Sequence, residues 1–230
     1  MTRRELLTTF LATAAVELSS EESRGQTAPQ PPQAKPLPFD PTKLNGLSEK
    51  LLRSHYDNNY MGAVRRLGQI ESQLAALPAS APGFQMKGLK MEELIATNSV
   101  ILHEEYFGNL GGDGKASGGL QQAIAQQFGA FDRWEQEFRA VSNSLGGGSG
   151  WAILSFNFRD GKLRNYIAFD HTDNVAFGRT ILVNDMFEHA YHMDFGSAAA
   201  RYVDAFMQNV NWQECNRRFD AATKASASLK

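Results

Sequence analysis

Hydrophobic positions in the first half of the chain recur every three or four residues, which is the spacing that one face of a helix requires. The first stripe of this kind consists of Leu44, Leu47, Leu51, Leu52 and His55. The helical pattern that carries it runs from residue 44 to about residue 77, with Ser48 as a candidate N-cap. After a turn region at residues 78–88, a second helical pattern runs from 91 to 107. The pattern therefore predicts a helical hairpin.

Glycines separate this hairpin from the helices that follow it. Six glycines lie between residues 108 and 119, and they predict a loop. Shorter helical patterns resume at residues 120–128 and 131–141. A second glycine cluster at residues 146–150 then marks a change in the pattern. The chain up to this cluster is therefore predicted to be helix and loop.

The chain beyond residue 150 begins with strands. Residues 151–158 and 163–169 are rich in aromatic and β-branched side chains, and they flank Asp160-Gly161, a dipeptide typical of tight hairpin turns. A third short strand is predicted at residues 180–183, and helix again from Glu188 onward. The predicted fold class is therefore α+β, with an N-terminal helical hairpin half and a C-terminal half that combines a small antiparallel three-stranded sheet with helices.

Prolines and arginines mark the start of the chain. All eight prolines precede residue 83, and six of them lie between residues 29 and 41, so residues 27–43 are interpreted as a proline-rich linker. Arg3 and Arg4 precede a short apolar run, which is typical of a twin-arginine export signal over residues 1–26. The protein is then expected to be periplasmic or otherwise exported. If residues 1–26 are only a tail, it is expected to be cytoplasmic.

The remaining sequence divides into an N-terminal helical domain at residues 44–126 and a C-terminal α/β domain at residues 127–230. With 42% hydrophobic residues, the chain has ample material for a core. No stretch approaches the ~18–20 apolar residues of a membrane helix, and a net charge of −2 without a long basic block argues against nucleic acid as the main partner. A single cysteine, Cys215, excludes an internal disulfide framework.

Histidine and aspartate are the remaining candidates for special chemistry. The chain has five histidines: His55, His103, His171, His189 and His192. His55 and His103 lie on the two long predicted helices, one on each, and Asp185 precedes His189 by four residues after a predicted strand. A single histidine on an apolar helix face is more often a core residue than a ligand. Three imidazoles and one carboxylate that converge would suit iron or manganese.

The order of these residues resembles the iron/manganese superoxide dismutase family. The segment Asp185-Met-Phe-Glu-His189-Ala-Tyr matches the family signature Asp-x-Trp-Glu-His-Ala-Tyr, with Phe187 in place of the tryptophan. Further similar segments are residues 128–138, 148–151 and 210–212, and the resemblance extends over residues 47–219. It implies a superoxide dismutase with one Fe or Mn ion per chain. The metal ligands would be His55, His103, Asp185 and His189.

The resemblance also implies roles for residues around the ligands. His171 lies where many members have a glutamine that hydrogen-bonds the metal-bound solvent, and some members have a histidine there. Trp151 would form part of an apolar wall that keeps the site dry. Glu188 matches a glutamate that reaches His189 of a second copy, so a homodimer is expected.

Four positions depart from the family pattern. Asn59 replaces a histidine, Ala63 a tyrosine near the metal, His192 a tyrosine and Ala199 an arginine near the substrate funnel. Arg201 is the cation nearest to Ala199 in the sequence. Two hypotheses follow: His192 and Asn59 together replace a hydrogen bond across the dimer, and Tyr60 or Tyr106 fills the space at Ala63. The alternative function is a metal-binding family member with slow or lost dismutation, in a binding or sensing role.

Overall fold

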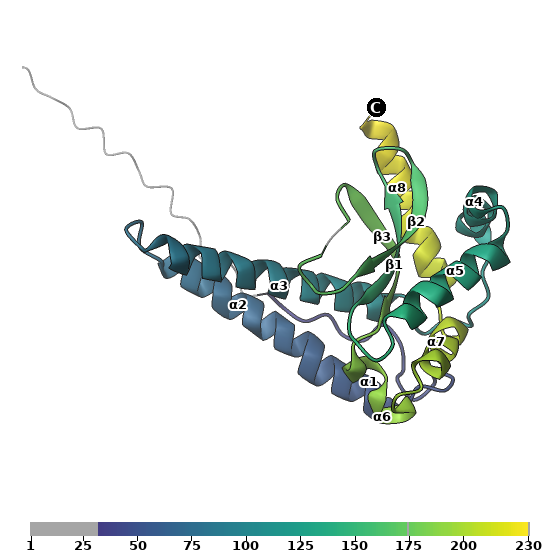
Figure 1. Ribbon diagram of the computed structural model, residues 1–230, viewed down its shortest axis with the longest axis horizontal. Coiled ribbons are helices and arrows are strands. Elements are labelled where there is room, and N and C mark those ends of the chain that lie inside the picture. Colours follow the sequence, from purple (N-terminus) through teal and green to yellow (C-terminus); the bar gives the residue numbers. More distant parts are fainter. Residues whose placement is uncertain (1–31, 174, 230) are drawn as a thin grey trace, which may run out of the picture.

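The structure is a computed structural model that describes residues 32–173 and 175–229 (Figure 1). The predicted export signal at residues 1–26 lies outside the described residues, as do residues 27–31 of the proline-rich segment. A long pair of helices projects from one side of the molecule, and the sheet with the remaining helices forms the other side.

The predicted helical hairpin is present. Its first arm is a continuous run of α1 (Glu49–Ser54), the π-helical turn η1 (His55–Tyr60) and α2 (Met61–Ala76), and its second arm is α3 (Gly83–Gly108). Ser48 caps α1, because its hydroxyl accepts a hydrogen bond from the Leu51 N–H at 3.1 Å. The first arm therefore begins later than residue 44, the start that the apolar stripe alone predicts.

The second arm begins eight residues before the predicted start at residue 91. Pro82 occupies the N-cap of α3, with a φ of −58°, and its carbonyl accepts from the Gln85 N–H at 3.0 Å. Proline is tolerated at a helix start because no intrahelical donor is lost there. The turn predicted over residues 78–88 therefore ends at residue 82, directly before α3 begins at Gly83.

The predicted three-stranded antiparallel sheet is confirmed, and the fold is α+β. Two helices precede it, α4 (Gly118–Phe128) and α5 (Phe131–Ser144). The strands are β1 (Trp151–Asn157), β2 (Lys162–Ala168) and β3 (Gly178–Asp185), in the order β2-β1-β3. β3 is longer at both ends than the predicted 180–183. Its last residue, Asp185, pairs directly with Trp151, the first residue of β1, so the register places both side chains at one end of the sheet.

Helices complete the C-terminal part. They are η2 (Glu188–Ala190, a 3₁₀ turn), α6 (His192–Phe195), α7 (Ala199–Gln208) and α8 (Trp212–Ser228). α5 packs against β1 and β2, while α3 and α8 pack against β3. α4 packs against α5 and α8, so the structure groups it with the C-terminal elements, and the division drawn between residues 126 and 127 crosses this helix. Among the described residues, no helix combines the length and the apolar character that a membrane span needs.

The described part of the proline-rich segment contains no helix or strand and packs against the hairpin. The Lys35 N–H donates to the Tyr60 hydroxyl at 2.7 Å, and the Tyr56 hydroxyl donates to the Lys35 carbonyl at 2.8 Å. Phe39 lies over Gly111, whose φ is +85° and where a Cβ would lie only 2.6 Å from the Phe39 Cβ. The segment therefore holds η1, which begins at His55, against the end of α3.

One large hydrophobic core joins the hairpin to the sheet. It contains residues of every strand and of most helices, and its largest fully buried side chains include Trp134 and Trp151. A smaller cluster of Leu67, Ile70 and Ala96 holds the outer part of the hairpin together. His55, His103 and Asp185 are among the few buried polar side chains of the large core. Burial of several titratable groups is costly unless they interact with one another or with an ion, so these residues identify the candidate site.

Candidate metal centre

Four elements bring the predicted ligands together. His55 is the first residue of η1, His103 lies in α3, Asp185 ends β3 and His189 lies in η2. Each side chain offers one donor atom, and the four donors lie within 4.8 Å of one another. Three of the residues are buried, and His189 is partly buried. The convergence predicted for these four residues is present.

The Asp185 carboxylate lies at the centre of this group. Its Oδ2 is 3.1 Å from His55 Nε2, 3.3 Å from His189 Nε2 and 3.7 Å from His103 Nε2. Its other oxygen, Oδ1, accepts a hydrogen bond from the Phe187 N–H at 2.9 Å. That bond fixes the carboxylate and leaves Oδ2 facing the three imidazoles.

Local structure also fixes the imidazoles. His103 Nδ1 lies 2.7 Å from the Ser99 carbonyl, one turn earlier in α3. A carbonyl can only accept, so Nδ1 carries the proton and Nε2 keeps its free electron pair. His55 lies in a π-helical turn, an irregularity that is frequent at functional sites.

The pKa values of His55, His103 and Asp185 favour the protonation states that a metal needs, whereas that of His189 favours the protonated imidazole until a cation replaces the proton. It lowers the pKa of His55 and brings that of His103 down to about 3. Burial alone would raise the pKa of Asp185, but attraction to His189 and His55 and the hydrogen bond with His189 outweigh it, and the pKa lies below its usual range. Burial likewise lowers the pKa of His189, but Asp185 outweighs it and raises that pKa. An ionised carboxylate beside neutral imidazoles is the form that binds a divalent or trivalent cation.

Two buried nitrogens of this group show that it fits a cation. Nε2 of His55 and Nε2 of His103 are buried without a hydrogen-bond partner among the described residues. An unsatisfied buried polar atom costs about 1–3 kcal/mol, and such atoms are rare without a function. These nitrogens face the same carboxylate oxygen, so a cation between the four donors would satisfy them together. Three nitrogens and one carboxylate oxygen suit iron or manganese.

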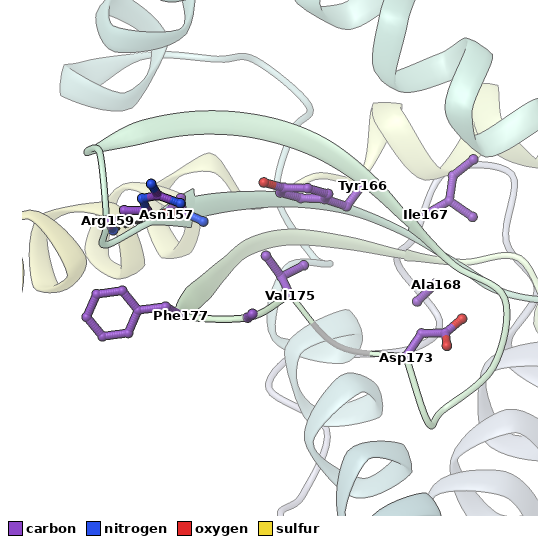
Figure 2. Close-up of a pocket in the computed structure, with 9 residues that line it drawn as sticks. Asn157, Arg159, Tyr166, Ile167, Ala168, Asp173, Val175 and Phe177 are labelled. Carbon is purple, nitrogen blue, oxygen red and sulfur yellow. Dashed lines mark hydrogen bonds between the residues drawn. The ribbon is translucent and has the colours of Figure 1, made fainter.

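A small cavity leads to this group. It has a volume of about 280 Å³, and it is lined by His103, His171 and His189 together with residues of η1, α2 and α3. A larger cavity of about 570 Å³ lies elsewhere, between β2, the turn after β1 and the segment that precedes β3 (Figure 2). None of the four converging residues lines the larger cavity. Access to the candidate centre is therefore through the smaller one.

His171 and Trp151, predicted from the resemblance, both lie beside the ligands. The Trp151 Nε1–H donates to His171 Nδ1 at 3.0 Å, which makes Nε2 the proton-bearing nitrogen of a neutral His171. Burial lowers the pKa of His171, which also favours the neutral form. Phe187 stacks on both His171 and His189, with ring centroids 4.9 and 5.4 Å apart. The Trp151 ring meets the His103 ring edge-on at 5.2 Å.

Tyr60, predicted to fill the space beside Ala63, is oriented differently. Its hydroxyl donates to Glu104 Oε1 at 3.0 Å and accepts from the Lys35 N–H, on the side of the proline-rich segment. Burial raises its pKa to about 12. Tyr106 is also absent from the described lining of the cavity, and its hydroxyl is hydrogen-bonded to the Tyr202 hydroxyl at 3.2 Å in the core. Neither tyrosine is among the described residues that line the cavity beside Ala63. That either one compensates for Ala63 stays a prediction.

Two residues near the centre had escaped sequence reasoning. The Tyr202 hydroxyl, in α7, donates to the Asp185 carbonyl at 2.8 Å and so holds the end of β3. Arg66, in α2, lines the cavity, whereas the described lining lacks Arg201 and Ala199. The signal for Arg66 was its spacing of three residues from Ala63, which places both on one helix face.

These features define an α+β fold with a site of three histidines and one aspartate that could hold one metal ion. The sequence model of "Iron/manganese superoxide dismutases, C-terminal domain" matches residues 116–218. The chain is 55% identical over 193 residues to a "Superoxide dismutase [Fe]" of Cupriavidus metallidurans, an alignment that covers 84% of this chain and 98% of that relative. The chain belongs to the iron/manganese superoxide dismutase family.

More distant relatives include both metal types. A "Superoxide dismutase [Fe]" of Aquifex pyrophilus is 33% identical over 199 residues, which is 83% of this chain and 92% of the relative. A "Superoxide dismutase [Mn] 1" of Halobacterium salinarum is 31% identical over 194 residues, which is 82% of this chain and 95% of the relative. The iron and manganese in the names of these relatives are the metals that suit three histidines and one aspartate.

Replacing one donor should abolish stoichiometric metal binding. We expect His189→Gln and Asp185→Ala to lower the iron or manganese content of natively purified protein at least about 10-fold, because three donors hold a cation less tightly than four. His192→Gln, an exposed histidine three residues further on, is the matched control and should retain the metal. Elemental analysis measures the metal content of each variant, and a circular dichroism spectrum checks that the variant is folded. Full metal content in folded His189→Gln and Asp185→Ala proteins would contradict the assignment.

Proposed function

We propose that the protein is a superoxide dismutase, which converts two superoxide anions and two protons to dioxygen and hydrogen peroxide. The observation that carries this proposal is the convergence of His55, His103, Asp185 and His189 beside a small cavity. Iron or manganese held by these four residues would supply the redox chemistry, which is the transfer of one electron from one superoxide to another. The 55% identity to an iron enzyme over most of the chain supports the same conclusion.

The residues around the ligands exclude water and hold a proton in place. Trp151 is completely buried, and together with Phe187 it forms an aromatic wall against His103, His171 and His189. A site with this lining has a low dielectric, so each charge and hydrogen bond in it acts strongly. The Trp151 N–H fixes His171 as the tautomer whose Nε2–H is a donor, and His171 lines the cavity where the substrate must enter.

The dismutation rate per bound metal tests this proposal. The wild-type protein with one iron or manganese per chain should dismutate superoxide rapidly in a stopped-flow or pulse-radiolysis assay. Trp151→Phe should lower the rate per metal by about 10-fold or more, because His171 loses the donor that sets its tautomer. Trp212→Phe makes the same chemical change far from the centre and should leave the rate per metal unaltered. A fully metallated wild-type protein without dismutation would instead favour the alternative of a binding or sensing member.

We also propose that the protein is a homodimer in which Glu188 reaches His189 of a second copy. Glu188 is exposed, and it directly precedes His189, the most exposed of the four ligands. Glu188→Gln should shift the protein towards the monomer in sedimentation velocity, because a carboxylate–imidazole hydrogen bond across the interface is lost. Asp220→Asn, an exposed acid on α8, should not. If the wild-type protein were still monomeric at a concentration about 10-fold higher than that of the dismutation assay, this would contradict the dimer.

We further propose that residues 1–26 direct export. The support for this is Arg3-Arg4 followed by a short apolar run, and the localisation would be periplasmic or otherwise exported. In a bacterium with a twin-arginine pathway, the wild-type protein should be found in the periplasmic fraction with a shortened N-terminus by mass spectrometry. Replacing Arg3 and Arg4 with lysine should leave the full-length chain in the cytoplasm. If the wild-type protein and the lysine variant were found in the periplasmic fraction in equal amounts, this would contradict a twin-arginine signal.

A further inference from the structure

The cavity that leads to the candidate centre has one strongly basic side chain in its wall. The described residues that line it are apolar, amide or hydroxyl side chains, a glycine, three histidines and Arg66. Among these described residues, only Arg66 carries a permanent charge. Since superoxide is an anion, the charge of this wall influences how fast the substrate enters.

Arg66 lies at the mouth of the cavity rather than at its base. Ala63 and Arg66 are three residues apart on α2, so they share a face of that helix. Ala63 is 9% exposed, whereas the Arg66 side chain is 54% exposed. Of these two lining residues, Arg66 is therefore the one exposed to solvent.

An ion pair with Glu92 fixes the position of Arg66. Arg66 Nη2 contacts the Glu92 carboxylate across the α2–α3 hairpin. Glu92 is 40% exposed and does not line the cavity, so of these two charged residues only Arg66 lines it. The pair also reduces the attraction that Arg66 exerts on an approaching anion, because the two charges partly cancel at a distance.

We propose that Arg66 draws superoxide into the cavity, and that Glu92 moderates this attraction. The inference rests on the proposed dismutase function and adds to it a residue that acts on substrate entry. The sequence predicted that Ala199 replaces an arginine near the substrate funnel. In the structure Ala199 lies buried in α7, with 7% of its surface exposed, and Arg201 is not among the described residues that line the cavity. Arg66 thus supplies from α2 a positive charge that α7 lacks at this entrance.

The test measures the second-order rate constant for superoxide against ionic strength. At about 0.01 M, where charges act over ~30 Å, Arg66→Gln should lower this rate constant about three- to tenfold. At 1 M, where charges act over only ~3 Å, the difference from wild type should fall below about twofold. Arg66→Lys should retain most of the rate constant. Glu92→Gln should raise it, because it removes the opposing charge.

Arg65→Gln is the matched control. Arg65 is the neighbouring exposed arginine on α2, and its replacement changes the net charge by the same amount, but it does not line this cavity. A steering role for Arg66 predicts that Arg65→Gln has less than half the effect of Arg66→Gln on a logarithmic scale. Equal effects would show that net charge alone matters and would overturn the proposal.

A second measurement does not depend on turnover. Azide is a small monovalent anion, and its affinity for the metallated protein can be followed by absorption spectroscopy. Arg66→Gln should weaken azide binding at low ionic strength, while the metal content stays at the wild-type value. Unchanged azide affinity and an unchanged rate constant in Arg66→Gln would overturn the role of Arg66. An inactive wild-type protein with full metal content would instead overturn the proposed function, and the azide titration would still report on Arg66.

Discussion

Asp185 Oδ2 faces three imidazole nitrogens at 3.1 to 3.7 Å, and the rest of the structure serves to maintain this arrangement. The groups are buried in a hydrophobic core, where an anion and unpartnered nitrogens are unfavourable unless a cation joins them. The β1–β3 register, the π-helical turn at His55 and the Ser99 carbonyl on α3 each fix one donor. Metal binding is therefore expected to contribute to the stability of the fold as well as to its chemistry.

Most of the fold could be predicted from the chain because its local signals agree with its tertiary structure. The apolar stripe before residue 55 and the Asp160-Gly161 turn correspond to a helix and a hairpin in the structure. The errors lie at the ends of elements. α3 begins at Gly83 because Pro82 suits a helix start, and β3 extends to Asp185 because its pairing with β1 continues to Trp151. Neither pairing partner nor cap geometry can be read from hydrophobic periodicity.

The sequence predicted the four donor residues of the candidate site better than the residues that surround them. The four donors carry a distinctive order of residue types, so the resemblance located them. The surroundings depend on which way a side chain turns in three dimensions. Tyr60 turns towards Glu104 and Lys35, and Arg66 reaches the cavity from a helix position that has no motif of its own. Such orientations follow from packing between distant segments, which one sequence does not specify.

The central claim is that a single iron or manganese ion is held by four named side chains of one protomer. Anomalous diffraction at the iron and manganese absorption edges from crystals of natively purified protein tests it most directly. The account predicts one anomalous peak per chain, within about 2.0–2.3 Å of Nε2 of His55, His103 and His189 and of a carboxylate oxygen of Asp185. A fully occupied iron or manganese peak at any other place in the molecule, with none among these four residues, would contradict it.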